Sequence, residues 1–518
     1  MARLERQPLL PPSDSRLSDD STIRSYSSIE DSCRQTQKST PLPKKQLAIL
    51  CIMRFTEPIS FTVIFPFINQ MIEDLGIASD RTHVGYYAGL IESLFAFAQL
   101  CTALYWGRLS DRIGRKPVIL TGLLGLAVSV ISFGLQSSLT GLIVTRALAG
   151  MMNGNIGILR SVIREITDHT NHAELIPKLS IKALGGLLGP LCGGYLARPA
   201  EQYPYLFGNI EFLKQYPYFL PGFVAGLFNL GAILLGLFCL EESLPSKCSG
   251  DLSPETRLKL YLESRKSISP SNSPTNETGP RSITSLLDKK LSGILLSFFM
   301  VNLQSASWNS LVPLFAYTRI SDGGLSLSLD QIGFCLSVNG IGLLVVQLLI
   351  FPPLQRRFRP LRLYQYTLPT HALGFILLPC LSLLVKSHSD PAVSLTGLTA
   401  TLILKSPGLI SFVCISIMLN NSAPSSSLGT LNGLAMTCTA LSYTIGPILA
   451  SSLFSYSIHT QFLGGNLVWV VMIMIDTYTC KTLDASDIII MLCCILAYRR
   501  GRRLSSKICA VEDDEEET

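Results

Sequence analysis

The chain has 518 residues, of which 48% are hydrophobic and only 15% are charged, and its formal net charge at pH 7 is +6. A soluble protein of this length would bury far more apolar surface than one or two hydrophobic cores require. The composition therefore argues against a soluble globular protein and indicates a protein that crosses a membrane many times.

The first 46 residues are rich in serine and in charged residues and contain no apolar run. No cleaved signal peptide is therefore predicted, and we expect residues 1–46 to form a disordered cytosolic tail. Residues 5–10 of this tail, ERQPLL, resemble an acidic dileucine sorting signal, which directs membrane proteins to the vacuole or lysosome. Short motifs of this kind also arise by chance. The motif favours a vacuolar or lysosomal membrane over the plasma membrane.

Twelve apolar runs follow the tail, and each has the roughly 20 residues that an α-helix needs to cross a bilayer core of about 30 Å. The runs begin near residues 47, 84, 118, 139, 178, 217, 291, 331, 364, 398, 429 and 466. Charged or polar segments separate them, including residues 107–117, a polar segment at 198–216 and a Ser/Pro-rich segment at 241–290. The pattern predicts an all-α integral membrane protein with twelve transmembrane helices and with both termini on one side of the membrane.

The 241–290 segment divides the runs into two groups of six, and its composition is too polar to fold alone. The predicted units are an N-terminal six-helix bundle at 47–240, a disordered cytosolic linker at 241–290, a C-terminal six-helix bundle at 291–498 and a cytosolic tail at 499–518. Each group carries a Gly-Pro pair in its fifth run, Gly189-Pro190 and Gly446-Pro447. This repetition predicts a duplicated six-helix unit.

Positive charge gathers on one side of the predicted topology. The segments 107–117, 160–182, 241–290 and 355–363 together contain twenty Lys and Arg residues, whereas the connections on the other side contain five. Loops rich in Lys and Arg remain in the cytosol. The charge pattern therefore predicts that these four segments and both termini face the cytosol.

Residues 107–117, GRLSDRIGRKP, combine four cations with one carboxylate, two glycines and a proline. A short cytosolic loop needs only the cations, so Asp111 is the informative residue. A carboxylate at a helix start can bind an arginine and also face the positive end of a helix dipole. Such contacts hold in one arrangement of the helices and break in another, and we therefore interpret the loop as a conformational latch.

This loop matches the signature between the second and third helices of the major facilitator superfamily. The matching residues are Gly107, Arg108, Leu109, Ser110, Asp111, Arg112, Gly114, Arg115 and Lys116. A second segment, GGLLGPLCGG, resembles the fifth-helix motif of the antiporters in that superfamily, although a glycine run also suits close helix packing. Its matching residues are Gly186, Gly189, Pro190, Gly193 and Gly194. The resemblance implies the major facilitator fold, two six-helix bundles, and transport by exchange.

Further segments resemble the drug:proton antiporters and the zinc-induced-facilitator-like transporters of that superfamily. They are RFTEPISFTVIFPFI at 54–68, RALAGMMNGN at 146–155, LEESLP after the sixth run and NNSAPSSSLGTLNG at 420–433. The chain departs from the family pattern from Asp476 on, where the polar stretch DTYTCKTLDASD predicts a break in the last helix.

Ionisable residues inside a membrane are costly and mark functional sites. Arg54 and Glu57 lie one helical turn apart in the first run, and we predict Glu57 as the proton site, with Glu92 in the second run as the second candidate. The alternative for Arg54 and Glu57 is an ion pair that only fixes packing. The family resemblance implies that Arg146, the arginine of the fourth-helix motif, takes part in proton coupling.

Polar side chains also recur at helical spacing within the fourth, seventh and eighth runs. We predict that the substrate cavity is lined by Asn153, Asn302, Trp308, Asn309 and Asn339. Contacts between neighbouring helices are the alternative role for each of these side chains.

No other chemistry is indicated by the sequence. It contains no phosphate-binding GxxxxGK[ST] loop and no catalytic GxSxG or HExxH motif, and its six histidines are scattered. We therefore predict no enzyme, no cofactor and no metal site.

The sequence predicts a secondary active transporter that exports a small organic or drug-like solute, a cation or a metal chelate, in exchange for protons by alternating access. Its expected partners are the solute, protons and the lipid bilayer but no nucleic acid, and we expect a monomer. The alternative is a membrane sensor or scaffold of the same fold that signals through the 241–290 linker, but a scaffold would not need the polar interior residues. A membrane enzyme would need a catalytic constellation that the sequence does not show.

Overall fold

The computed structural model describes residues 44–78, 80–155, 157–159, 162, 181–242, 289–388, 390–422 and 428–482. The sorting signal at 5–10, nearly all of the linker at 241–290 and the tail at 499–518 lie outside the described residues. Every regular element among the described residues is a helix.

The N-half is the part from α2 to α13, and its first helix begins three residues before the first predicted run. Its long helices are α2 (Lys44–Thr62), α4 (Val84–Ile113), α5 (Arg115–Phe133), α6 (Leu139–Met152), α9 (Ile181–Leu196) and α13 (Phe219–Cys239). Short helices connect or extend them: α3 (Ile68–Asp74), η1 (Arg81–His83), η2 (Asn153–Asn155), α10 (Pro199–Gln202), α11 (Pro204–Phe207) and α12 (Glu211–Gln215).

The C-half is the part from α17 to α25. It contains α17 (Lys289–Tyr317), α18 (Leu329–Val345), the π-helical turn η4 (Val346–Ile350), α19 (Phe351–Arg357), α20 (Pro360–Thr367), α21 (Pro369–His388), α22 (Pro391–Lys405), α23 (Gly408–Asn421), α24 (Leu428–Thr460) and α25 (Leu467–Thr482). Proline at the first turn starts α20 and α22, because its missing N–H group would be unpaired there in any case. A capping box formed by Ser328 and Gln331 starts α18.

The predicted all-α membrane fold is confirmed. Among the described residues, nine helical stretches are long and apolar enough to cross a membrane, and α9 contains a shorter apolar stretch, Leu184–Leu196. A count of twelve crossings for the whole chain stays a prediction. The predicted break at Asp476 is wrong as far as Thr482, because α25 continues through Asp476 and buries it completely. Residues 483–498 lie outside the described residues.

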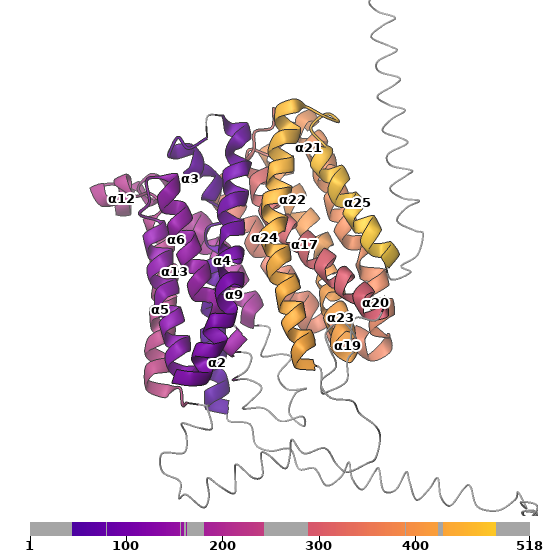
Figure 1. The fold of residues 1–518 in the computed structure, drawn as a ribbon. Coiled ribbons are helices and arrows are strands. Elements are labelled where there is room, and N and C mark those ends of the chain that lie inside the picture. The colour runs from indigo at the N-terminus through magenta and orange to yellow at the C-terminus, as the bar shows by residue number, and fades with distance from the viewer. Residues whose placement is uncertain are drawn as a thin grey trace, which may run out of the picture.

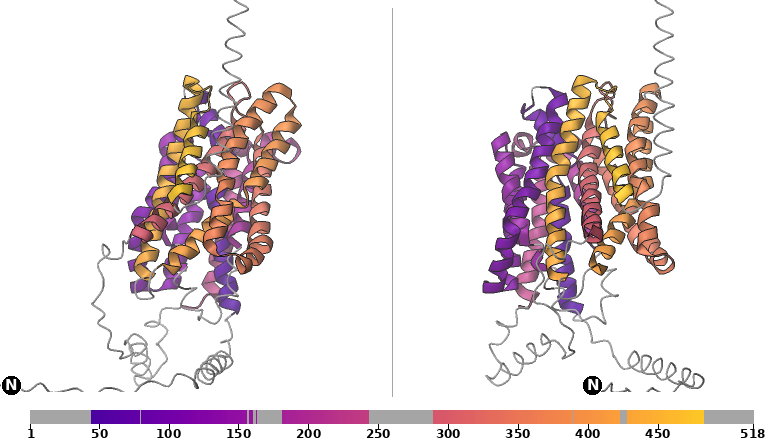
Figure 2. Two further views of the ribbon diagram at one scale, coloured as in Figure 1. Left: turned by 90° about the vertical axis from the view of Figure 1, so that its right-hand side faces the viewer. Right: turned by 45° about the vertical axis from the view of Figure 1, so that its right-hand side comes forward.

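The two halves stand side by side (Figure 1). The axes of their long helices are roughly aligned with one another, as the turned views show (Figure 2). Two helix pairs make most of the contacts between the halves, α4 with α24 and α9 with α18. Glycine permits both close approaches: a Cβ atom added to Gly89 would lie 2.8 Å from the carbonyl oxygen of Pro447, and one added to Gly333 would lie 2.9 Å from the Cα atom of Gly194. Such contacts are typical of helices that pack inside a bilayer.

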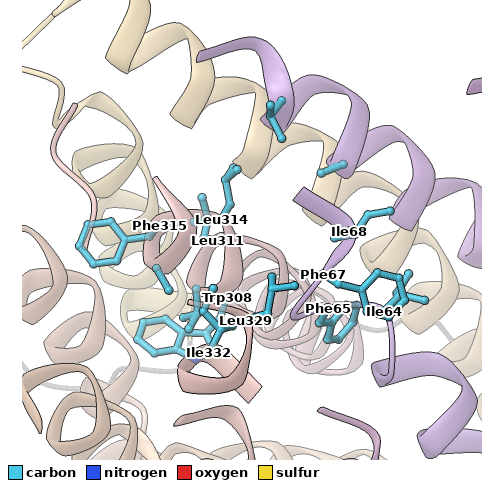
Figure 3. Close-up of a cluster of buried hydrophobic side chains, with 14 of the residues drawn as sticks. Ile64, Phe65, Phe67, Ile68, Trp308, Leu311, Leu314, Phe315, Leu329 and Ile332 are labelled. Atoms are coloured by element: carbon cyan, nitrogen blue, oxygen red, sulfur yellow. The ribbon is translucent and has the colours of Figure 1, made fainter. Parts of the chain in front are cut away.

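A hydrophobic cluster also spans the two halves. It contains buried side chains from the connection between α2 and α3, including Phe65 and Phe67, and from α17 and α18, including Trp308, Leu311 and Leu329. Figure 3 shows these side chains pointing into a common region. The cluster extends the contact between the halves toward the end of the protein that carries α3.

Candidate functional site

Two opposite charges are buried near each other, Glu92 on α4 and Arg146 on α6. Glu92 is 5% exposed and Arg146 is 3% exposed, and each is the main opposite charge near the other. The guanidinium carbon of Arg146 lies 4.4 Å from the ring centre of Phe95 and 5.4 Å from that of Phe61. Aromatic faces attract a cation. The rings therefore help to hold Arg146 in place beside the Glu92 carboxylate.

The Glu92 side chain also borders a small pocket between the halves. The pocket is lined by Phe61, Phe65, Glu92, Ala96, Ala306, Asn309, Tyr443 and Pro447. The first four come from the N-half and the last four from the C-half. Ser310 on α17 lies near Glu92, so the carboxylate faces both halves. One carboxylate, one amide and three aromatic rings therefore surround the pocket.

The structure places Glu57 apart from this pocket. Its carboxylate accepts a hydrogen bond from Arg54 at 2.9 Å, one turn earlier on α2, and both side chains are mostly buried. Glu57 does not line the pocket between the halves. Of the two predicted carboxylates, Glu92 therefore lines the pocket between the halves and Glu57 does not.

The remaining predicted cavity residues fall into different places. Asn309 lines the pocket, whereas buried Asn302 donates a hydrogen bond to the Phe298 carbonyl of its own helix at 2.7 Å. Trp308 faces away from the pocket, because its ring packs on Phe375 with 5.2 Å between ring centres. Asn153 is buried at the end of α6, and Asn339 is half-buried on α18.

The C-half contains a second buried charged group that the sequence reasoning missed. Asp476 on α25 is fully buried, and Lys405 on α22 is its nearby cation. The ammonium of Lys405 lies 4.6 Å from the ring centre of Trp308. Buried His371 stands close to Lys405. The sequence does contain an indication of this group, because Lys405 is an ionisable residue within a predicted apolar run.

The two halves thus repeat one device. In each, a cation from the fourth long helix lies over an aromatic ring of the first, Arg146 over Phe61 and Lys405 over Trp308. The carboxylate near each cation comes from a different position in the two halves: Glu92 from the second long helix, α4, and Asp476 from the last helix, α25. A duplicated unit would produce the shared positions of the cation and the ring, but not those of the carboxylates.

The predicted latch residues form a charged turn at the other end of α4. Arg115 donates hydrogen bonds to Asp111 at 2.7 Å and to the Ser110 hydroxyl at 2.6 Å. Asp111 therefore binds an arginine, as expected. The carboxylate at the helix start is a different one: Glu242, which follows α13, accepts hydrogen bonds from the backbone N–H groups of Arg115 at 2.7 Å and Lys116 at 3.1 Å.

Gly114 makes this arrangement possible. Its φ of 111° lies in a region that L side chains rarely adopt, and a Cβ atom there would meet the Glu242 carboxylate. Lys116 adds a hydrogen bond from its ammonium to the Leu237 carbonyl at 3.0 Å. The turn therefore ties α4, α5 and the end of α13 together within the N-half. Gly107 is open, with no atom near a Cβ placed on it, and Arg108 and Arg112 are exposed.

The glycine motif of α9 presents two different faces. Gly189 and Gly193 face the α2 backbone at Ile59 and Val63. Gly194 packs on Gly333 of α18 and Pro190 offers its carbonyl to the same glycine, whereas a Cβ on Gly186 would meet no atom. The motif therefore contributes both to packing within the N-half and to the contact with the C-half.

Contacts between the halves also gather at the α3 end. The Tyr317 hydroxyl of α17 donates a hydrogen bond to Glu73 of α3, and Arg81 pairs with the same carboxylate. Farther along α4, beside Glu92, the backbone N–H of Ile448 donates to the Ser93 hydroxyl at 3.1 Å. On α3 the neighbouring Asp74 accepts a hydrogen bond from Tyr218, within the N-half. The contact between Tyr317 and Glu73 therefore holds the two halves together at the α3 end.

The described residues contain no group of three or more His, Cys, Asp or Glu side chains placed to hold a metal ion. The arrangement that they do contain, buried charges beside a pocket shared by two similar halves, is that of a carrier for small solutes.

Comparison with known proteins identifies the family. The family model described as Major Facilitator Superfamily matches residues 50–447. The chain belongs to the major facilitator superfamily.

Named relatives of this major facilitator protein indicate the branch of the superfamily to which it is similar. It is 35% identical to the Major facilitator-type transporter psiT2 of Psilocybe cyanescens, over 91% of this chain and 96% of the relative. It is 31% identical to the Major facilitator superfamily multidrug transporter mfsB of Aspergillus fumigatus, over 81% and 80% of the two chains. It is 29% identical to the Protein ZINC INDUCED FACILITATOR 1 of Arabidopsis thaliana, over 82% and 87%.

A solved structure supports the same fold. A bacterial homolog of the human lysosomal transporter Spinster, in an inward-facing and occupied conformation, superposes with a TM-score of 0.60 over 86% of this chain and 97% of that chain, at 13% identity. The family, the relatives and the fold together show that this multi-pass membrane protein is a major facilitator transporter of the drug-efflux and zinc-induced-facilitator-like branch, and not an enzyme.

The carboxylate of Glu242 provides a test of the charged turn. Replacing it by glutamine removes the charge that faces the first N–H groups of α5, and we expect a loss of about 1–2 kcal/mol of stability. Thermal unfolding of the purified protein in detergent measures this loss. The matched control is Glu241→Gln: this neighbour is exposed, and its backbone N–H, which the substitution leaves in place, donates to the Gln46 side chain. Equal melting temperatures for the two variants would contradict the role of Glu242.

Proposed function

We propose that this transporter exports a small organic cation or drug-like solute in exchange for protons, and that Glu92 with Arg146 couples the two. The supporting observation is the position of Glu92, which is buried beside Arg146 and borders a pocket lined by both halves. A carboxylate in this position can hold either a proton or a cationic solute. Competition for one carboxylate produces exchange.

The aromatic surroundings support the solute class. Phe61, Phe65 and Tyr443 line the same pocket as Glu92 and Asn309. Aromatic faces and one carboxylate favour an amphipathic cation over an anion or a sugar. The relative named as a multidrug transporter agrees with export of such compounds.

The direction of exchange rests on the glycine motif and on the charged turn. Gly194 and Gly333 let the backbones of α9 and α18 approach closely, so these helices form a contact between the halves that can move. The turn around Asp111 stiffens the N-half at the predicted cytosolic end. In this proposal the halves rock about the pocket, and the contact of Tyr317 with Glu73 at the α3 end breaks when that end opens. A vacuolar or lysosomal membrane remains the proposed location.

Flux in sealed vesicles tests the proposal. We expect the purified full-length protein, reconstituted into vesicles with an acidic interior, to accumulate the probe ethidium and to release protons that an entrapped pH dye reports. A proton ionophore should abolish both signals. The matched control is empty vesicles carrying the same gradient. Absence of flux for a panel of organic cations in any pH gradient, with correctly folded protein, would instead favour a sensor or scaffold.

A further inference from the structure

An aromatic segment projects between α9 and α13. This segment, residues 198–218, contains the short helices α10, α11 and α12. The sequence pattern predicts only a polar break here, but the structure exposes large apolar and aromatic side chains: Tyr205 is 103% exposed, Leu206 73%, Phe212 44% and Ile210 42%. Four such side chains on one short segment form a surface that water does not favour.

The location of the segment limits what can cover it. Both α9 and α13 belong to the predicted membrane-spanning set, so the chain that joins them leaves and re-enters the bilayer at the same surface. Figure 1 shows α12 beside the flank of the N-half, close to the end that carries α3. The segment therefore extends sideways over the lipid next to the protein.

The base of the segment is fixed by polar contacts. The backbone N–H of Arg198 donates to the Pro217 carbonyl at 2.8 Å, which closes the segment into a loop. The Arg198 guanidinium pairs with Glu201 at 2.6 Å and lies 4.0 Å from Asp74 of α3. The Leu213 side chain is 6% exposed and anchors α12 to the protein. The exposed side chains are thus held in place.

The aromatic surface continues into the membrane-spanning helix. The ring centres of Phe212 and Phe219 are 5.0 Å apart, and those of Phe219 and Phe223 are 5.4 Å apart. Phe219 and Phe223 belong to α13, which is the most hydropathic helix of the N-half. The segment therefore extends a lipid-facing surface that already exists.

We propose that residues 198–218 lie in the headgroup region of the bilayer, with Tyr205, Leu206 and Phe212 inserted at the boundary with the acyl chains. Amphipathic aromatic rings favour that depth. The charges of the segment, Arg198, Lys214, Glu201 and Glu211, sum to zero. Zwitterionic lipid is therefore sufficient, and anionic lipid adds nothing.

Fluorescence in vesicles tests this placement. Tyr205→Trp is made in the full chain, and its added emission is taken as the difference from the parent protein, which has three tryptophans. We expect phosphatidylcholine brominated near the headgroup to lower the added emission by at least about twofold, and more than lipid brominated near the chain ends. Aqueous iodide should have little effect. Adding phosphatidylglycerol should leave the quenching unchanged.

The matched control is Ser321→Trp, in the exposed connection between α17 and α18. There we expect quenching by iodide and not by brominated lipid. Iodide quenching of the tryptophan at position 205 would overturn the proposal, because the segment would then stand in water. Lipid quenching that disappears as the protein-to-lipid ratio rises would also overturn it, because a second copy of the chain would then be the partner.

Discussion

Replacing Glu92 by glutamine is expected to abolish proton-driven transport. The amide keeps the size of the side chain but cannot take up or release a proton, and it leaves Arg146 buried without its opposite charge. In reconstituted vesicles, accumulation of ethidium driven by an acidic interior should fall to the level of protein-free vesicles. Exchange of labelled for unlabelled ethidium without a pH gradient needs no net proton transfer, so it should persist at raised ethidium concentration, although the apparent affinity falls because no carboxylate remains to hold the cation. The two assays therefore separate loss of coupling from loss of the protein.

The matched control for this prediction is Glu57→Gln. Its carboxylate lies in the first long helix as an ion pair with Arg54, and it does not line the pocket between the halves. We expect at least half of the proton-driven accumulation to remain. If Glu57→Gln removes the accumulation and Glu92→Gln preserves it, the proton site lies on α2, as the position of Glu57 along the sequence suggests.

Neutralising either Lys405 or Asp476 alone is expected to destabilise the C-half strongly. Lys405→Met leaves the fully buried Asp476 carboxylate without its nearby cation, and such a loss typically costs about 3–5 kcal/mol; Asp476→Asn leaves the half-buried Lys405 ammonium without its carboxylate and should cost somewhat less. The double variant Lys405→Met/Asp476→Asn removes both charges and should recover most of the stability. Thermal unfolding in detergent and the yield of monodisperse protein measure the three variants as a double-mutant cycle.

Lys481→Met is the control for that cycle. Lys481 lies in the last turn of α25, is exposed and should change stability by less than about 0.5 kcal/mol. If the costs of Lys405→Met and Asp476→Asn simply add in the double variant, the two side chains do not interact and the repeated device in the two halves is only a similarity of position.

The sequence was sufficient to predict the helices, because a membrane-spanning helix is encoded locally by a run of apolar residues. The charged turn at 107–117 was also predictable, since glycine and opposite charges occur together within eleven residues. The prediction of a break at Asp476 was wrong because it used only the local sequence. A local polar stretch suggested an exposed connection, whereas Lys405 on α22, distant in the sequence, lies near the carboxylate and allows it to be buried within a helix.

The choice between Glu57 and Glu92 could not be made from the sequence. Depth along a helix is visible in a sequence, but the direction that a side chain faces between two bundles is not. The pocket beside Glu92 takes Asn309 and Tyr443 from the other half, more than 200 residues away. The role of Glu242 was hidden in the same way, because 127 residues separate it from the N–H of Arg115.

Two neighbouring carboxylates on α3 have a wider consequence. Glu73 bonds to Tyr317 of the opposite half, while Asp74 bonds to Tyr218 at the base of the aromatic segment. Any opening at this end therefore shifts a helix that is tied both to the partner bundle and to side chains seated among lipid headgroups. Each turnover would deform the nearby leaflet, so transport speed should respond to bilayer thickness and stiffness as well as to the difference in pH.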